Sequence, residues 1–194
     1  LKLFREASRF VSSLAGQGKT VLFVGTKRQA QEAIAEEAQR CGMFYVNHRW
    51  LGGTLTNWAT LQKSIKRLKT LKAMIEDGRM GDLSKKEAAR LERELKHLRQ
   101  NLSGVENMNT PPDAMFVVDS HNEAIAVREA RRMGVPVVGV VDTNSDPDQV
   151  DWVIPGNDDA LRAIRLFTTK IAEAVIEGRS AFEQSQLASE KAAS

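Results

Sequence analysis

The chain has 194 residues, of which 42% are hydrophobic and 27% charged, as in an ordinary globular protein with one sizeable core. No run approaches the ~20 apolar residues of a membrane span, and no signal-peptide pattern opens the chain. The only cysteine, Cys41, excludes an internal disulfide, fits a reducing compartment and is expected to pack rather than react. Because the first residue is Leu1 rather than Met, we expect a segment to precede it.

The net charge of +3 is unevenly distributed along the chain. Residues 49–103 carry 13 basic and 6 acidic side chains, whereas residues 104–194 carry 8 basic and 15 acidic ones. We therefore expect the middle block to contact a polyanion and the acidic last third to face proteins or solvent. The alternative is that the lysines merely solvate a helical face.

The first part of the chain is expected to alternate helices with buried strands. Continuous apolar runs that end at a glycine fit strands covered on both faces, as in parallel sheets. Thr26 and Gln29 have capping-box spacing, which predicts a helix start there. In chain order we expect a helix over 1–15, a strand over 20–25, a helix over 27–40 and a strand over 44–46.

Residues 58–103 have a different pattern, with apolar side chains at coiled-coil spacing in two arms. Gly78–Asp82 predicts a turn between the arms, and Ser84 with Glu87 predicts a capped second helix. We expect an antiparallel coiled-coil hairpin whose arms of ~18 residues reach ~27 Å from the sheet. The expected seam residues are Leu61, Ile65, Leu68 and Ile75, with Lys72 in the skipped position, and Ala88, Leu91, Leu95, Leu98 and Leu102.

Strand and helix alternation resumes after this insertion. Ser120 and Glu123 again have capping-box spacing. The predicted elements are a strand over 114–119, a helix over 124–133, strands over 135–142 and 152–155, and a helix from Asp158 or Asp159 to about Gly178. Such alternation predicts a doubly wound, mostly parallel α/β sheet of the Rossmann or flavodoxin type. We expect a discontinuous core domain over 1–57 and 104–183, the hairpin over 58–103, and a flexible polar tail over 184–194.

Several enzyme and ligand motifs are incomplete. Gly16–Thr20 precedes its strand instead of following it, so it is not a phosphate-binding loop. Gly25–Arg28 does lie between a strand and a helix, where an anion could bind, but a plain turn is favoured. Asp142–Val153 lacks the glycine and glutamate of a calcium loop. Asp119 and Asp142 occupy positions of catalytic acids, yet nothing is spaced to complete a constellation, so capping and loop hydrogen bonds are expected of them. The scattered histidines give no metal pattern, and we expect no cofactor.

The most informative segment is Asn47–Trp58, NHRWLGGTLTNW. Its paired glycines permit unusual backbone angles or close approach of another chain. Its tryptophans, arginine and histidine supply stacking faces and phosphate donors for RNA. The alternative is that Trp50 and Trp58 fix the root of the hairpin to the sheet.

His48–Trp58 closely resembles the bacterial ribosomal protein S2 family, a component of the small subunit. So do Pro112–Asp119 with Glu123, Gly134–Pro147 and Ile154–Asn157, and Thr20–Lys27 matches the family's first core strand. The likeness extends from about Thr20 to Phe182. The family's His/Trp-rich stretch before its first helix has no counterpart ahead of Leu1.

The resemblance implies a doubly wound domain with a coiled-coil insertion and a non-catalytic role in small-subunit architecture and translation. It also implies a place at the head–body junction, contact with ribosomal RNA and neighbouring ribosomal proteins, and recruitment of the mRNA-capturing ribosomal protein S1. The expected location is the cytoplasmic ribosome, with no membrane and no small-molecule substrate.

From the residues themselves we expect the hairpin and the segment at its root to contact RNA, mainly through phosphates. Two rival readings stay open: an enzyme that binds a nucleotide or sugar phosphate at the carboxyl edge of the sheet, and an adaptor whose hairpin holds a partner helix. The residues assigned to RNA contact are Arg49, Trp50, Lys63, Lys66, Arg67 and Lys69, with Lys27 and Arg28 as weaker candidates.

Overall fold

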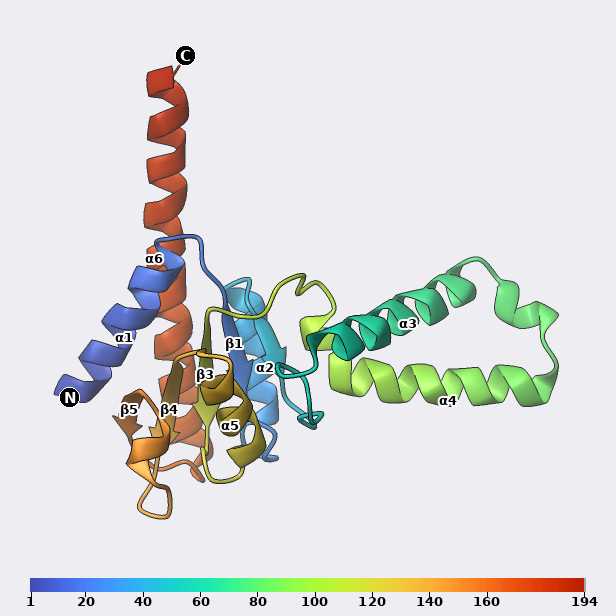
Figure 1. The fold of residues 1–194 in the computed structure, drawn as a ribbon, viewed down its shortest axis with the longest axis horizontal. Helices are drawn as coiled ribbons and strands as arrows, with labels where there is room; N and C mark the ends of the chain where they lie inside the picture. Colours follow the sequence, from blue (N-terminus) through green and yellow to red (C-terminus); the bar gives the residue numbers. More distant parts are fainter. Residues whose placement is uncertain (194) are drawn as a thin grey trace.

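A computed structural model describes residues 1–193 and is built on a five-stranded, all-parallel sheet (Figure 1). In spatial order the strands are β2 (Phe44–Val46), β1 (Val21–Val24), β3 (Ala114–Val118), β4 (Val137–Val141) and β5 (Trp152–Pro155). Every residue of β1, β3 and β4 is buried, because helices cover both faces of the sheet. The expected Rossmann-like sheet is therefore confirmed.

One face of the sheet is covered by α1 (Lys2–Ala15), α2 (Gln31–Arg40) and α6 (Leu161–Ala193). The core on this side contains Phe23 and Phe116, whose ring centroids are 5.5 Å apart in an edge-to-face arrangement. Helix α1 packs along α6 so closely that a Cβ atom added at Gly178 would lie 2.2 Å from the carbonyl oxygen of Ser12.

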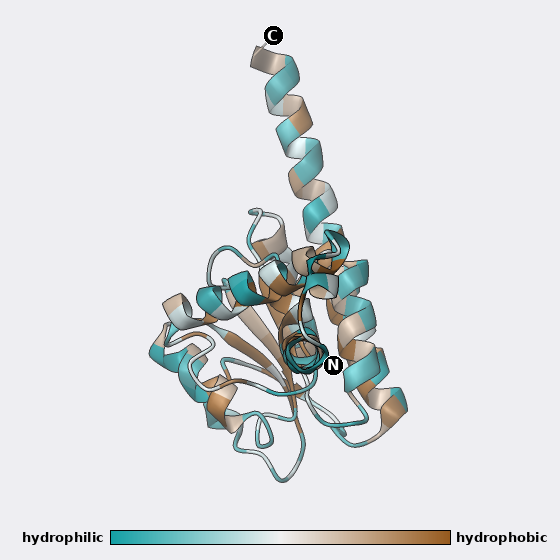
Figure 2. Cartoon of the chain, turned by 90° about the vertical axis from the view of Figure 1, so that its right-hand side faces the viewer, coloured by the Kyte–Doolittle hydropathy of each residue, from teal (hydrophilic) through white to brown (hydrophobic). Residues whose placement is uncertain are grey.

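The other face is covered by α5 (Ala124–Arg132) and by the base of α3 (Trp58–Glu76) and α4 (Lys85–Leu102). Figure 1 shows α3 and α4 leaving the sheet side by side, while the end of α6 projects separately. In Figure 2 the strands are brown and the projecting part of α6 is largely teal or pale. The remaining elements are the short 3-10 turns η1 (Arg79–Asp82), η2 (Ser103–Val105) and η3 (Pro147–Gln149).

The α3–α4 pair follows the predicted turn and cap but shifts part of the predicted apolar stripe. Gly78 is left-handed with φ +74°, and Ser84 and Glu87 form a complete capping box. Leu71 is fully buried, whereas Ile75 is 43% exposed, so the expectation for Ile75 was wrong. By helical geometry Ile75 lies on the same side of α3 as Leu68, seven residues earlier, but it is in the last turn of the helix, close to η1.

Two predicted capping boxes were also wrong. Helix α2 starts at Gln31 rather than Lys27, and no side chain caps it. Helix α5 starts after Glu123, again without a side-chain cap. Instead, the Glu123 carboxylate accepts hydrogen bonds from the backbone N–H of Thr26, at 2.8 Å, and from its hydroxyl. Two bonds between the segments that follow β1 and β3 therefore take the place of the two predicted local caps.

Helix α6 differs from its prediction at both ends. It starts at Leu161, after Asn157 accepts hydrogen bonds from the backbone N–H groups of Asp159 and Ala160. It continues to Ala193 instead of ending near Gly178, which stays helical where α1 packs against it. Flexibility of residues 184–194 stays a prediction. None of the helices described combines the length and apolarity needed to cross a bilayer.

Candidate functional site

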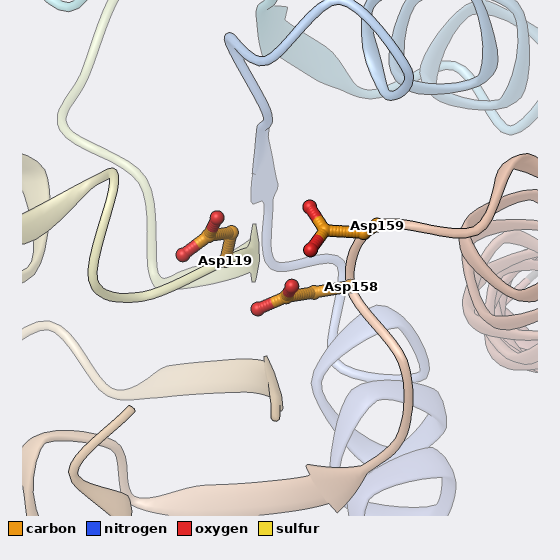
Figure 3. A group of neighbouring side chains, drawn as sticks. All are labelled: Asp119, Asp158 and Asp159. Carbon is orange, nitrogen blue, oxygen red and sulfur yellow. The ribbon is translucent and has the colours of Figure 1, made fainter. Parts of the chain in front are cut away.

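The carboxyl edge of the sheet holds a dense group of charges. Lys27 follows β1. Asp119 follows β3, and Asp158 and Asp159 lie between β5 and α6 (Figure 3). The Lys27 Nζ atom lies 2.6 Å from Asp119, 3.3 Å from Asp158 and 2.7 Å from Asp159. Three carboxylates that could hold a metal ion by their spacing therefore surround an ammonium group instead.

This arrangement explains the protonation of its members. Burial alone would lower the pKa of Lys27, but the hydrogen bonds and charges of the aspartates outweigh it and raise that pKa above its ordinary value. Burial, together with the charge of Asp119, raises the pKa of Asp158, and Lys27 opposes this increase. Lys27 stays cationic at neutral pH, and its ammonium is satisfied within the protein.

The position of this cluster bears on ligand binding. The strand order reverses between β1 and β3, and Rossmann-like folds bind small ligands outside the carboxyl ends of strands at such a point. Lys27 and the three aspartates fill that place here. A phosphate would meet carboxylates there rather than free donors, which argues against the nucleotide or sugar-phosphate enzyme. It also argues against RNA contact by Lys27, whose side chain is only 12% exposed.

Asp119 was expected to take part only in capping and loop hydrogen bonds. It does accept a bond from the backbone N–H of Asn122 at 3.0 Å, in a left-handed conformation with φ +65°. Its ion pair with Lys27 was missed, as was the contribution of Asp158 and Asp159. The signal was present, since Lys27 and Asp119 both follow buried strands whose carboxyl ends meet at one edge.

A second cluster fixes residues 47–57, here called the root loop, to α5. The Glu129 carboxylate accepts hydrogen bonds from the Trp50 indole N–H at 3.2 Å and from the backbone N–H of Gly53 at 2.6 Å. It also accepts from the backbone N–H groups of Leu55 at 3.0 Å and Thr56 at 3.2 Å. Burial alone would raise the pKa of Glu129, but these four bonds outweigh it and lower that pKa.

The structure of the root loop bears on the two roles that the sequence left open for Trp50, RNA stacking and anchoring of the hairpin. Trp50 is 8% exposed and its indole N–H is bonded to Glu129, which favours the anchoring role over stacking on RNA. Gly53 adopts φ +89°, the unusual backbone angle that the paired glycines allowed. Arg49 and His48 remain exposed on the same loop. Sequence reasoning missed Glu129, which gave no local signal.

The α3–α4 pair carries the remaining candidates. Lys63, Lys66 and Lys69 are exposed, and their side chains have no hydrogen bond or ion pair within residues 1–193. Arg67 is exposed too, but its guanidinium donates to both carboxylate oxygens of Glu94 at 2.7 and 3.1 Å. Its charge is thus largely balanced inside the pair. Arg28 is exposed beside the filled carboxyl edge.

Known proteins resemble the chain over nearly all of its length. A sequence model of the family described as ribosomal protein S2 matches residues 1–178. The "Small ribosomal subunit protein uS2" of Acidobacterium capsulatum is 66% identical over 190 residues, covering 98% of this chain and 63% of the relative. The protein of the same name from Koribacter versatilis is 65% identical, covering 97% and 63%, and that of Geotalea uraniireducens 56%, covering 93% and 71%. The chain thus spans 63% of the length of the first two relatives.

Proposed function

The chain belongs to the ribosomal protein S2 family, and from this we propose that it is a non-catalytic constituent of the small ribosomal subunit in the cytoplasm. In this proposal it binds ribosomal RNA mainly through phosphates, and it contacts neighbouring small-subunit proteins. A place at the head–body junction and recruitment of ribosomal protein S1 are proposed from the family resemblance alone.

The observation that supports RNA binding best is the row of free lysines on α3. Lys63, Lys66 and Lys69 recur at three-residue spacing, so they lie within an arc of about 120° on one side of the helix. No acidic side chain of residues 1–193 pairs with them. Free ammonium groups along one side of a projecting helix fit the backbone of a structured RNA.

We further propose that α3 and α4 form a short antiparallel coiled coil, inserted as residues 58–103 into a core domain of residues 1–57 and 104–183. Leu61, Ile65 and Leu68 on α3, and Leu91 and Leu95 on α4, are buried and belong to one apolar cluster. Because these side chains are already covered, the pair lacks a free apolar seam for a partner helix. This argues against the hypothesis that the hairpin is an adaptor that holds a partner helix.

The proposal is tested by binding to a transcript of small-subunit ribosomal RNA from Acidobacterium capsulatum over a range of salt concentrations. We expect wild-type affinity to fall steeply with salt. The triple variant K63Q/K66Q/K69Q is expected to bind more weakly and to lower the slope of log K against log salt by about 2. The control K2Q/K19Q/K170Q removes the same charge from exposed positions of the core. RNA binding by α3 is refuted if both triple variants behave alike.

A further inference from the structure

Helix α5 departs from the acidic character of its part of the chain. Arg128, Arg131 and Arg132 are all exposed on it. Its only acidic residue, Glu129, is 8% exposed and is hydrogen-bonded to the root loop. The helix therefore presents positive charge to solvent although residues 104–194 are net acidic.

Arg128 and Arg132 border a hollow of about 350 Å³ that α5 shares with the root loop. The side chains of Arg128 and Arg132 have no hydrogen bond or ion pair within residues 1–193. Both carboxylate oxygens of Glu129 are committed to N–H donors of the root loop and its tryptophan. The hollow is lined by Thr56, Ile125, Arg128, Glu129 and Arg132.

We propose that this arginine face of α5 is a second contact for the phosphate backbone of RNA, with Arg128 and Arg132 as its donors. This inference rests on the proposed function and extends the RNA-binding surface into a part of the chain that its charge assigned to proteins or solvent. Arginine suits the role because its planar fork can donate two hydrogen bonds to one phosphate.

The placement of α5 supports a polymer rather than a small free anion as the ligand. Helix α5 and the base of the α3–α4 pair contribute to the same apolar core on one face of the sheet. The root loop joins them, since it leads into α3 and is held by Glu129 of α5 (Figure 1). Arg49 is exposed on this loop, so in this proposal the RNA strand runs from the lysines of α3 past Arg49 to α5.

A purely structural reason exists for part of this charge. Arg131 and Arg132 lie in the last turn of α5, where cations favour the helix dipole. Arg131 also donates to the carbonyl oxygen of Asp148 at 3.4 Å. Arg128 is in the middle of the helix, so neither reason applies to it, and it is the more diagnostic position.

The test compares R128Q/R132Q with R5Q/R9Q, using the same ribosomal RNA transcript and the same salt range. Arg5 and Arg9 are also exposed and four residues apart on one helix, but they lie on α1, which covers the opposite face of the sheet. We expect R128Q/R132Q to lower the slope of log K against log salt by about 1.5 and R5Q/R9Q to leave it nearly unchanged. R128K/R132K, which keeps the charge, is expected to retain the wild-type slope.

The outcomes separate this inference from the proposed function. If the wild type binds the transcript and R128Q/R132Q matches R5Q/R9Q, the α5 contact is wrong and the RNA-binding proposal stands. If the wild type does not bind, both fail. Thermal unfolding checks that R128Q/R132Q folds. Should it not, the single variant R128Q replaces it, with an expected slope change of about 0.8, and an unchanged slope overturns the inference.

Discussion

Replacing Lys27 with methionine tests whether the ammonium at the carboxyl edge holds three segments together. Methionine retains most of the apolar stem and removes only the charge and its hydrogen bonds. Asp119 and Asp158, whose side chains are 15% and 8% exposed, would then lose their cationic partner. Asp159 is 70% exposed, so water screens its charge and its pair adds little.

The expected loss follows from these exposures. Removing one member of a buried ion pair costs about 3–5 kcal/mol, because an uncompensated charge is left behind. Since the cluster reaches solvent on the Asp159 side, we expect the lower end, a decrease of about 3 kcal/mol in the free energy of unfolding. The control is Lys2→Met, because that side chain is 90% exposed and its pair with Glu6 spans 4.0 Å, so its effect is expected to be near zero.

The pH dependence separates charge from packing. In the wild type, burial and Asp119 already raise the pKa of Asp158, and loss of Lys27 raises it further. A carboxyl group with a folded-state pKa above its unfolded value is destabilising when ionised, and the penalty decreases as pH falls below that folded-state pKa and is absent below the unfolded pKa. The decrease in the free energy of unfolding caused by Lys27→Met is therefore expected to be largest near pH 7 and to become smaller towards about pH 4.

Urea unfolding followed by circular dichroism at the two pH values measures this deficit for both variants. A deficit of the same size at both pH values would refute the electrostatic reasoning and assign the loss to packing of the Lys27 stem. A negligible deficit at neutral pH would show that the cluster does not connect the ends of β1, β3 and β5.

Two further predictions concern the anchoring of the root loop and the packing of α1 on α6. Glu129→Gln is expected to lower the free energy of unfolding by about 2–3 kcal/mol, because an amide cannot accept all four N–H donors and its own NH₂ group faces some of them. The pKa of Glu129 is lowered in the folded protein, so its stabilisation is present above the unfolded-state pKa and is lost as pH falls through the folded-state pKa. Urea unfolding at about pH 7 and about pH 3 measures the stability loss and its pH dependence. Equal stability of the variant and the wild type would contradict the anchoring role of Glu129. Gly178→Ala is expected to lower the melting temperature although alanine favours helices, because its Cβ would lie 2.2 Å from the Ser12 carbonyl oxygen. Gly81→Ala, with nothing within 4 Å, is the control, and equal melting temperatures of the two variants would disprove the steric argument.

The sheet was predictable because its signal is local and repeated. Each of β1, β3 and β4 is a continuous apolar run, and each lies within a predicted range. Alternation with helices then leaves few topologies, since crossovers between parallel strands are right-handed. The Ser84 cap was also predictable, because its partner Glu87 lies only three residues away and both side chains are exposed.

The same local pattern failed at Thr26 because a distant partner competed for it. Glu123 lies 97 residues further along the chain, but the neighbouring strands β1 and β3 bring it within 2.8 Å of the Thr26 backbone N–H. Spacing in the sequence cannot rank a local cap against a contact that only the folded sheet creates. The role of Trp50 was equally hard to predict, because a tryptophan suits both stacking on RNA and burial against Glu129.

The basic side chains of this chain differ in whether the protein itself supplies hydrogen-bond acceptors for them. At the carboxyl edge, Lys27 is surrounded by acceptors of the protein itself, so the place where this fold binds small ligands is occupied by its own side chain. Within residues 1–193, Lys63, Lys66 and Lys69 on α3 and Arg128 and Arg132 on α5 have no such acceptors. Arg67 and Lys72 differ from them, because they pair with Glu94 and Glu106. A cation without an internal partner can neutralise a phosphate, and so release counterions from the RNA, without first breaking an ion pair. It follows that the number of basic residues overestimates RNA contact, and that neutralising Lys66 is expected to weaken RNA binding more than neutralising Arg67 one position away.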